Sequence, residues 1–260
     1  MAILNSNLQT GKSWMTESIA LFKAAPSRWM LLATIYVTIF MMMPSLPGFQ
    51  VFSIITILIW PIFMVIAIAM YKNADTHVTQ NFNSIFDSIK PKMQSLLILG
   101  GIVLLYGVLI SLLLNSDIES LMGLSKSIEN MTETQAVAIL GKSGPFLLKL
   151  TLALIPILMA TWFSPMLIAF NNYSVIKALK SSIAGSLQYL VAMSITWILL
   201  TLGIFSLLII SGIVMVLISS MLPVLAQLLM PAVVLGSLLL ATALMLAFQY
   251  VSYRDVFRAA

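Results

Sequence analysis

The sequence predicts an all-α polytopic membrane protein with six transmembrane helices. The chain has 260 residues, of which 61% are hydrophobic and only 8% are charged, and its mean hydropathy is +1.08. A water-soluble domain carries about 25% charged and about 45–50% apolar residues. Apolar stretches of the roughly twenty residues needed to cross a bilayer recur along the chain between short polar segments. Lipid must therefore be the solvent for most of the surface.

The chain is expected to form a single transmembrane domain, residues 1–260, in which amphipathic helices separate pairs of spans. We call these surface-lying amphipathic helices elbows. The expected spans are about 29–46, 49–71, 93–115, 146–170, 189–219 and 224–249. The expected elbows are about 13–25, 81–90 and 174–184, and an outer segment covers 116–144.

The first elbow is indicated by Trp14, Leu21 and Phe22 among polar residues such as Lys23, a pattern typical of an interfacial helix. Pro26 ends it, because proline has no amide donor and disfavours helix in the residue before it. Two spans joined by a short uncharged turn follow, and a Trp-Pro pair interrupts the second of them.

The second elbow is indicated by Phe82 and Phe86, which recur at helical spacing in a polar segment. The third span after it carries Gly100, Gly101 and Gly107. Small residues let helix backbones approach closely in a membrane. We therefore predict that another helix packs against this glycine stripe.

The outer segment is expected to form two short helices on the membrane surface. Ser116 and Glu119 have capping-box spacing, Thr132 and Gln135 repeat a similar device, and Gly141 is expected to stop the second helix. The fourth span then leads into the third, basic elbow. The fifth span is apolar for about thirty residues, so it must tilt, bend or protrude.

An even number of spans places both termini on one side of the membrane. That side would carry ten of the thirteen Lys and Arg residues, whereas Lys126, Lys142 and Lys149 would lie on the other. Cytoplasmic loops of membrane proteins are enriched in these cations. We therefore expect the N- and C-termini in the cytoplasm.

An internal repeat of elbow, span and span, used three times in parallel orientation, is also predicted. Each even-numbered span ends in a small residue, a bulky residue and a nearby tyrosine: Ala69-Met-Tyr71, Ala169-Phe-Asn-Asn-Tyr173 and Ala247-Phe-Gln-Tyr250. Aromatic and basic residues at the cytoplasmic face are common to multispan proteins, which is the alternative explanation. Pro61, Pro165 and Pro231 in the three even spans favour the repeat.

Three stretches carry a resemblance to known proteins: Trp14 to Trp29 with its run Ala-Leu-Phe-Lys-Ala-Ala-Pro-Ser-Arg-Trp, the pair Trp60-Pro61, and Ile85-Phe-Asp87. They resemble a family of uncharacterised proteobacterial six-span inner-membrane proteins, and more distantly the membrane domain of some glycerophosphodiester phosphodiesterases. The likeness covers most of the chain through short aromatic motifs. It implies six helices in the bacterial inner membrane, but no established activity and no catalytic residue.

No catalytic, metal or cofactor site is expected. The chain has no Cys and one His, His77, which follows Asp75 in a polar segment. Metal sites need several converging ligands, and no nucleophile-elbow motif stands near this histidine. We therefore predict a protein that is not an enzyme and uses no cofactor. A functional role for His77 as half of an acid–base pair is the alternative to a solvated loop residue.

The charged residues also bear on partners. The Lys and Arg residues are scattered singly without interleaved aromatics, so no nucleic-acid partner is expected. Ion-coupled carriers usually hold ionisable residues within their spans. The apolar spans hold only Lys149, near the end of the fourth, where its stem can snorkel to the headgroups.

Six cations in and beside the elbows are candidate lipid headgroup contacts. Each cation near anionic lipid contributes about 1 kcal/mol, although topology anchoring explains them equally well. They are Lys23, Arg28, Lys90, Lys92, Lys177 and Lys180.

Prolines in the even spans are candidates for helix bends around a cavity. Each removes a backbone hydrogen bond, and freed carbonyls at membrane depth are tolerated where protein or water satisfies them. The positions are Pro61, Pro156, Pro165 and Pro231. The alternative is that these prolines only set packing shape.

The sequence thus favours a non-enzymatic inner-membrane protein that binds phospholipids, a membrane protein partner or both, as an accessory or envelope-assembly component. The alternative is a small transporter or lipid-translocating protein with a cavity between proline-bent helices. A bundle centre filled by side chains would favour the first, and a polar or lipid-sized cavity the second.

Overall fold

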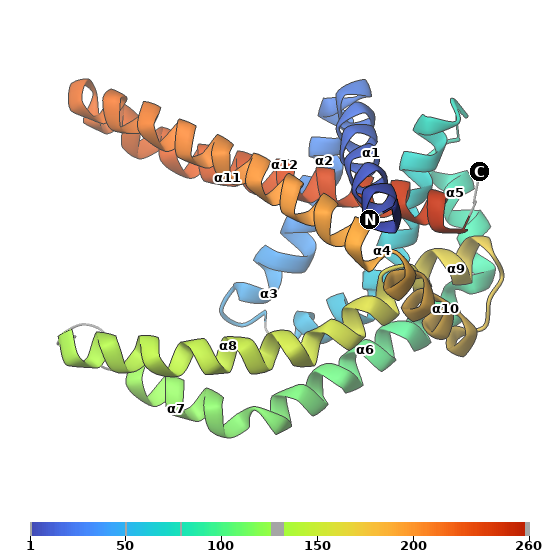
Figure 1. Ribbon diagram of the computed structural model, residues 1–260, viewed down its shortest axis with the longest axis horizontal. Coiled ribbons are helices and arrows are strands. Elements are labelled where there is room, and N and C mark those ends of the chain that lie inside the picture. The colour runs from blue at the N-terminus through green and yellow to red at the C-terminus, as the bar shows by residue number, and fades with distance from the viewer. Residues whose placement is uncertain (1, 50, 79, 126–132, 258–260) are drawn as a thin grey trace.

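The chain folds into α-helices joined by short turns in the computed structural model (Figure 1). The structure describes residues 2–49, 51–78, 80–125 and 133–257, and these contain no strand. The helices are α1 (Ala2–Ala24), α2 (Pro26–Val37), the π-helix η1 (Thr38–Met42), α3 (Met43–Ser45), α4 (Phe52–Asp75), α5 (Phe82–Ile89), the 3₁₀ helix η2 (Lys90–Lys92), α6 (Met93–Leu113), α7 (Asn115–Ser125), α8 (Glu133–Thr161), α9 (Ser164–Phe170), α10 (Val175–Gln188), α11 (Leu190–Met221) and α12 (Pro223–Phe257). The predicted all-α class is confirmed.

Six helical stretches in the described residues are long and apolar enough to cross a membrane. They are Pro26–Ser45, Phe52–Asp75, Phe82–Leu113, Ser143–Phe170, Leu190–Met221 and Pro223–Phe257. The protein is therefore a multi-pass membrane protein with six spans, as the sequence predicts.

The three expected elbows are helical. The first, α1, extends back to Ala2 and lies along α11 and α12. Gly11 permits this approach, since a Cβ there would lie 2.8 Å from the backbone oxygen of Ala192, and Thr196 donates a hydrogen bond to the Gly11 carbonyl at 2.9 Å. Asn81 begins α5 by accepting the amide hydrogen bond of Ser84 at 2.8 Å. The third elbow is α10.

Each elbow contacts the even span that precedes it along the chain. Helix α5 packs on α4, and α10 packs on α8 and α9. Helix α1 has no preceding span, and it packs on α12, the last even span. The predicted threefold repeat itself stays a prediction.

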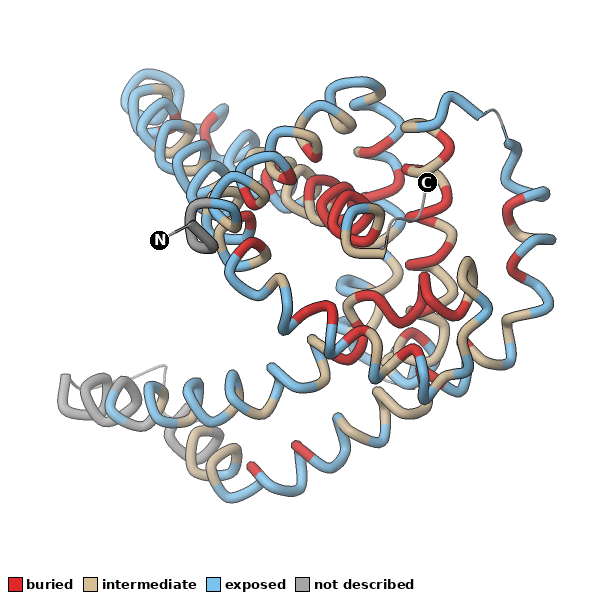
Figure 2. The backbone as a smooth tube through the Cα atoms, turned by 45° about the vertical axis from the view of Figure 1, so that its right-hand side comes forward, coloured by how far each residue is buried: buried red, intermediate tan, exposed pale blue. Residues whose placement is uncertain are grey.

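The buried core lies at the end of the molecule that carries the elbows and the C-terminal part of α12. In Figure 2 the buried residues gather at this end, while the long helices leading away from it are mostly exposed. Trp14, Trp29 and Tyr71 are fully buried there. Trp29 stacks on Tyr71 with ring centres 3.9 Å apart, and the Tyr71 hydroxyl donates to the carbonyl of Ala243 at 2.8 Å. We call this part of the molecule the elbow end.

The structure departs from the predicted elements in the outer segment and after residue 249, the expected end of the sixth span. Of residues 116–144, the stretch 126–132 with Lys126 and Thr132 lies outside the described residues. Helix α8 then runs from Glu133 through Gly141 into the fourth span, so the expected stop at this glycine is wrong. Helix α12 likewise continues to Phe257. Extending an existing helix avoids the cost of nucleating a new one, which favours both continuations.

The fourth span is not a continuous helix. Helix α8 ends at Thr161, two residues form a bend, and α9 begins at Ser164 with Pro165 in its first turn. Proline suits that position because the amide it lacks would have no partner there. The break lies beside a cavity between the spans.

Candidate functional site

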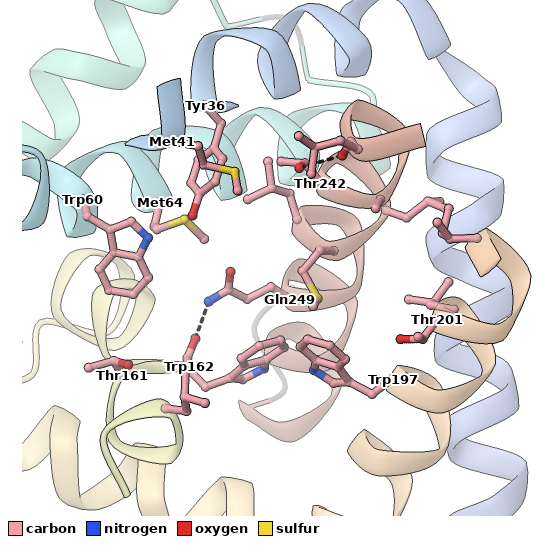
Figure 3. Close-up of a pocket in the computed structure, with 18 of the residues that line it drawn as sticks. Tyr36, Met41, Trp60, Met64, Thr161, Trp162, Trp197, Thr201, Thr242 and Gln249 are labelled. Carbon is pink, nitrogen blue, oxygen red and sulfur yellow. Dashed lines mark hydrogen bonds between the residues drawn. The ribbon is translucent and has the colours of Figure 1, made fainter. Parts of the chain in front are cut away.

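A cavity of about 450 Å³ lies among the spans (Figure 3). Its size is within the range of about 300–1,000 Å³ typical of small-molecule sites. Every span contributes to its wall except the one built on α6. The lining residues are Tyr36, Met41, Trp60, Met64, Leu158, Thr161, Trp162, Trp197, Leu200, Thr201, Ile204, Phe205, Leu238, Ala241, Thr242, Leu244, Met245, Leu246 and Gln249.

The cavity has a closed end and an open wall. Gln249 and Met64, toward the elbow end, are each only 4% exposed. Leu158 on α8 is 57% exposed, and Trp197 and Phe205 on α11 are 46% and 60% exposed. Met41 on η1 and Leu238 on α12 are 48% and 37% exposed, so the most exposed part of the wall is formed by α8 and α11 with Met41 beside them.

Helix packing explains why this wall is open. Helix α4 packs along α6, and α12 packs against α2, so an even span meets an odd span at two seams. Among the described residues α11 instead packs mainly on α12 and α1, and the α11–α12 pair diverges from the α6–α8 pair in Figure 1. The third seam, between α8 and α11, is not closed by helix packing, and exposed lining residues of the cavity lie along it.

The helix break at Trp162 and Phe163 shapes the closed end. In a continuous helix the Phe163 amide would donate to the carbonyl of Met159. Instead it donates to Oγ of Ser182 at 3.0 Å, and Ser182 donates to the Met159 carbonyl at 2.7 Å. Ser182, on α10, is fully buried. An elbow side chain thus replaces the missing backbone hydrogen bond.

A second side chain satisfies the other side of the break. Nε2 of Gln249, on α12, donates to the carbonyl of Trp162 at 2.6 Å. The Trp162 indole nitrogen donates to Oγ of Ser252 at 3.3 Å. Helix α12 therefore holds the bend from two positions and places Trp162 in the cavity wall, as Figure 3 shows.

The cavity lining carries no formal charge. None of its residues, all of them described, is Lys, Arg, His, Asp or Glu. Its polar groups are the hydroxyls of Tyr36 and three threonines, three indoles and the Gln249 amide. The Trp60 indole nitrogen faces the Tyr36 hydroxyl (Figure 3). Such a lining suits an uncharged or largely apolar molecule.

A charged cluster lies outside the cavity, at the elbow end. Arg254 on α12 forms ion pairs with Glu17 on α1 and with Asp75 at the end of α4, the latter at 2.8 Å. The Trp14 indole donates to Asp255 at 2.7 Å. These contacts join segments that are far apart in the sequence, and they fasten the first elbow to the ends of two spans.

The six cations predicted as headgroup contacts lie in or beside the elbows. Lys92 is half-buried and the other five are exposed, and none forms an ion pair within the part of the chain that the structure describes. Lys177 lies over the ring of Tyr173 at 3.9 Å, and Arg28 lies 5.2 Å from that of Trp29. Their role as headgroup contacts stays a prediction.

None of the four predicted prolines lines the cavity. Pro61 is buried inside α4, next to the lining residue Trp60, whereas Pro156 in α8 and Pro231 in α12 are exposed within unbroken helices. Pro165 is buried beside the helix break. Other residues of α4, α8 and α12 line the cavity, but none of α9 does, and the role of these prolines as bends around a cavity stays a prediction.

Two other residues considered in the sequence have local partners. His77, two residues after the end of α4, has a positive φ of 56°, and the amide of Val78 donates to the Asn73 carbonyl at 2.9 Å. This pattern closes the helix C-terminus. Lys149 forms an ion pair with Asp117 of α7 at 2.9 Å, so its charge is met by a carboxylate of the neighbouring helix.

Sequence reasoning missed Gln249, Ser182 and Met41 as site residues. A glutamine at the end of an apolar run and a serine in an elbow carry no local signal, because their partners lie on other helices. Met41 belongs to η1 and lines the cavity. A π-helix in a span often marks a functional position, yet the sequence gives little notice of it.

The fold and the cavity together define a multi-pass α-helical membrane protein with a laterally open, uncharged cavity. Comparison with family models, with curated proteins and with solved structures found no match.

Proposed function

We propose that this chain is a non-enzymatic integral membrane protein that binds lipid, and that the cavity is its lipid site. The observation that carries the proposal is the cavity's lateral opening between α8 and α11. A site that opens along the flank of two spans exchanges its contents with the hydrocarbon interior of the bilayer. Water-soluble ligands would meet a largely apolar wall.

The composition of the wall supports a lipid. Leucine, isoleucine, methionine and aromatic side chains make up most of it. In a bilayer, moving a hydrocarbon chain from bulk lipid into the cavity brings no hydrophobic free energy, because both surroundings are apolar. Close van der Waals packing of the chain against the wall is what would stabilise the bound lipid. The unpaired cations at the elbows are available to the headgroups of surrounding anionic lipids.

The remaining parts of the hypothesis concern setting and partners. We place the protein in the bacterial inner membrane with both termini in the cytoplasm, on the distribution of its cations and on the resemblance to proteobacterial six-span proteins. Helix α11 exposes most of its 32 residues. That face is available to lipid or to a membrane protein partner in an accessory or envelope-assembly role.

Lipid translocation or transport is the second candidate, and the presence of a cavity among the spans favours it. Moving a phospholipid between leaflets requires a path for a charged headgroup, because burying an unpaired charge is costly. The cavity lining offers no charged side chain, and Gln249 with Trp162 closes its elbow end. The geometry therefore supports binding better than passage.

Native mass spectrometry of the protein extracted gently from its own membrane tests the proposal. We expect a retained lipid, identified by mass. Ala241→Trp, which fills the cavity, should remove that lipid. Ala232→Trp places the same side chain on the exposed face of the same helix and should retain it.

A second variant separates the cavity from the elbows. Replacing Lys90, Lys92, Lys177 and Lys180 by glutamine should leave the cavity lipid bound. Loss of all lipid in this variant, with Ala241→Trp unaffected, would move the site to the elbows. A lipid-free protein that carries a stoichiometric second polypeptide would make the chain an accessory subunit and end the lipid-site proposal.

A further inference from the structure

We infer that the cavity selects an uncharged lipid that carries a hydroxyl group, such as a diacylglycerol, over a phospholipid with the same acyl chains. This inference rests on the proposed function and names the ligand class of the same site. Three features carry it: the charge-free lining, an acceptor on Gln249 and a donor on Tyr36.

The Gln249 side chain presents a hydrogen-bond acceptor to the cavity. Its Nε2 faces the carbonyl of Trp162 at 2.6 Å, which fixes the orientation of the amide because a carbonyl can only accept. The other polar atom of the amide, Oε1, accepts no hydrogen bond from the described residues. Every fully buried side-chain oxygen of these residues has a hydrogen-bond partner, so Oε1 is not fully buried. Oε1 is therefore reached from the cavity, although the residue is only 4% exposed (Figure 3).

Tyr36 presents a donor from a different helix. Tyr36 lines the cavity together with Trp60, and the indole nitrogen of Trp60 can only donate, so it cannot accept the hydroxyl hydrogen of Tyr36. The hydroxyl hydrogen then has no acceptor among the described residues. A lipid hydroxyl or ester that enters the cavity can receive this hydrogen bond, and a hydroxyl can also donate to Gln249.

An acceptor and a donor without charge distinguish between lipid headgroups. A phosphate brings a negative charge that no cation in the lining meets, and Oε1 of Gln249 would repel it. A hydroxyl matches both groups and loses little when it leaves water, because it is hydrogen-bonded again. The same two groups disfavour a plain hydrocarbon, which would leave both unpaired.

The test compares three probes with identical acyl chains, titrated against the purified full-length protein and followed by native mass spectrometry. The probes are a diacylglycerol, its deoxy analogue in which hydrogen replaces the hydroxyl, and phosphatidic acid. We expect the diacylglycerol to bind about three- to tenfold more tightly than the deoxy analogue, the effect of one net hydrogen bond. Phosphatidic acid should bind more weakly than the diacylglycerol.

Two variants locate the recognition. Tyr36→Phe should weaken diacylglycerol binding about three- to tenfold. Tyr106→Phe is the matched control, since that hydroxyl donates to the Ala153 carbonyl at 2.7 Å and lies outside the cavity, and it should bind like the unmodified protein. Gln249→Met should remove the preference for diacylglycerol over its deoxy analogue. If the protein does not fold without the Gln249 hydrogen bond at the helix break, the binding measured with Tyr36→Phe decides the inference alone.

The outcomes separate the inference from the function on which it rests. Suppose that phosphatidic acid or the deoxy analogue binds as tightly as the diacylglycerol, and that Ala241→Trp abolishes this binding. The cavity is then a lipid site, and the inferred selectivity for a hydroxyl is overturned. If none of the three probes binds, and no lipid is retained from the native membrane, the lipid-site proposal falls as well.

Discussion

Replacing Ser182 with alanine should destabilise the protein through the helix break, although the substitution removes a single oxygen. That oxygen accepts from the Phe163 amide at 3.0 Å and donates to the Met159 carbonyl at 2.7 Å. The carbonyl keeps a weaker partner, Oγ of Ser186 at 3.3 Å. The Phe163 amide keeps none among the described residues, and Phe163 is fully buried.

The expected cost follows from that asymmetry. A buried donor left without a partner costs about 1–3 kcal/mol, whereas an average side-chain hydrogen bond in a membrane protein contributes about 0.6 kcal/mol. We expect Ser182→Ala to lower the free energy of unfolding by about 1–2 kcal/mol. Reversible unfolding of the purified protein by sodium dodecyl sulfate in mixed micelles measures this quantity.

Ser206→Ala is the matched control. The Ser206 hydroxyl is exposed and bonds only to the Leu202 carbonyl of its own helix at 2.7 Å, so its loss should change the free energy of unfolding by less than about 0.5 kcal/mol. If Ser182→Ala is no more destabilising than Ser206→Ala, the break does not depend on this serine and our account of the bend is refuted.

Three further predictions test the packing, the charged cluster and the topology. Gly100→Ala should lower the free energy of unfolding by about 1–3 kcal/mol, because the new Cβ would lie 2.4 Å from a backbone oxygen of α4. Gly101→Ala should raise the free energy of unfolding by up to about 1 kcal/mol, because no heavy atom lies within 4 Å of the new Cβ and alanine favours a helix more than glycine does. Changes of the same sign in the two variants would contradict this packing. Arg254→Gln should lower the free energy of unfolding by about 1–3 kcal/mol in the same assay, because the carboxylates of its partners on α1 and α4 are only partly exposed. An unchanged free energy of unfolding would mean that solvent already screens the cluster. In this cysteine-free chain a membrane-impermeant maleimide should label Leu222→Cys in intact spheroplasts and Asn83→Cys only after permeabilisation, and the reverse pattern would invert the proposed orientation.

The spans were predictable because they depend on composition over many residues. Close helix packing was predictable in part: Gly100 does meet α4, as the glycine stripe predicts, whereas Gly101 and Gly107 face open space. The three residues look alike in sequence. Which of them meets a neighbour depends on the rotation of α6 about its own axis, and an almost uniformly apolar helix carries no periodic pattern from which to read that rotation.

The site was less predictable than the fold, for a related reason. Pro165 signals a disturbance in the fourth span, but the bend lies at Trp162 and Phe163, where partners from α10 and α12 satisfy the backbone. Arg254 and Glu17 are 237 residues apart, so no local pattern pairs them. Hydrogen bonds between distant helices determine both features, and each requires the tertiary arrangement to be known first.

The helix break and the cavity are linked by a single contact, and this link separates binding from translocation. The hydrogen bond from Gln249 to the Trp162 carbonyl both satisfies the break and closes the elbow end of the cavity. A lipid that enters between α8 and α11 and leaves by the same seam does not disturb it. A lipid that passed through this end would have to open it, and opening it would expose a backbone carbonyl and an amide at once. In a low-dielectric surrounding each unmade bond of this kind is costly. A protein built for repeated passage would be expected to place water or charged groups there, whereas this chain places a buried glutamine and a tryptophan, which favours a bound lipid over a transported one.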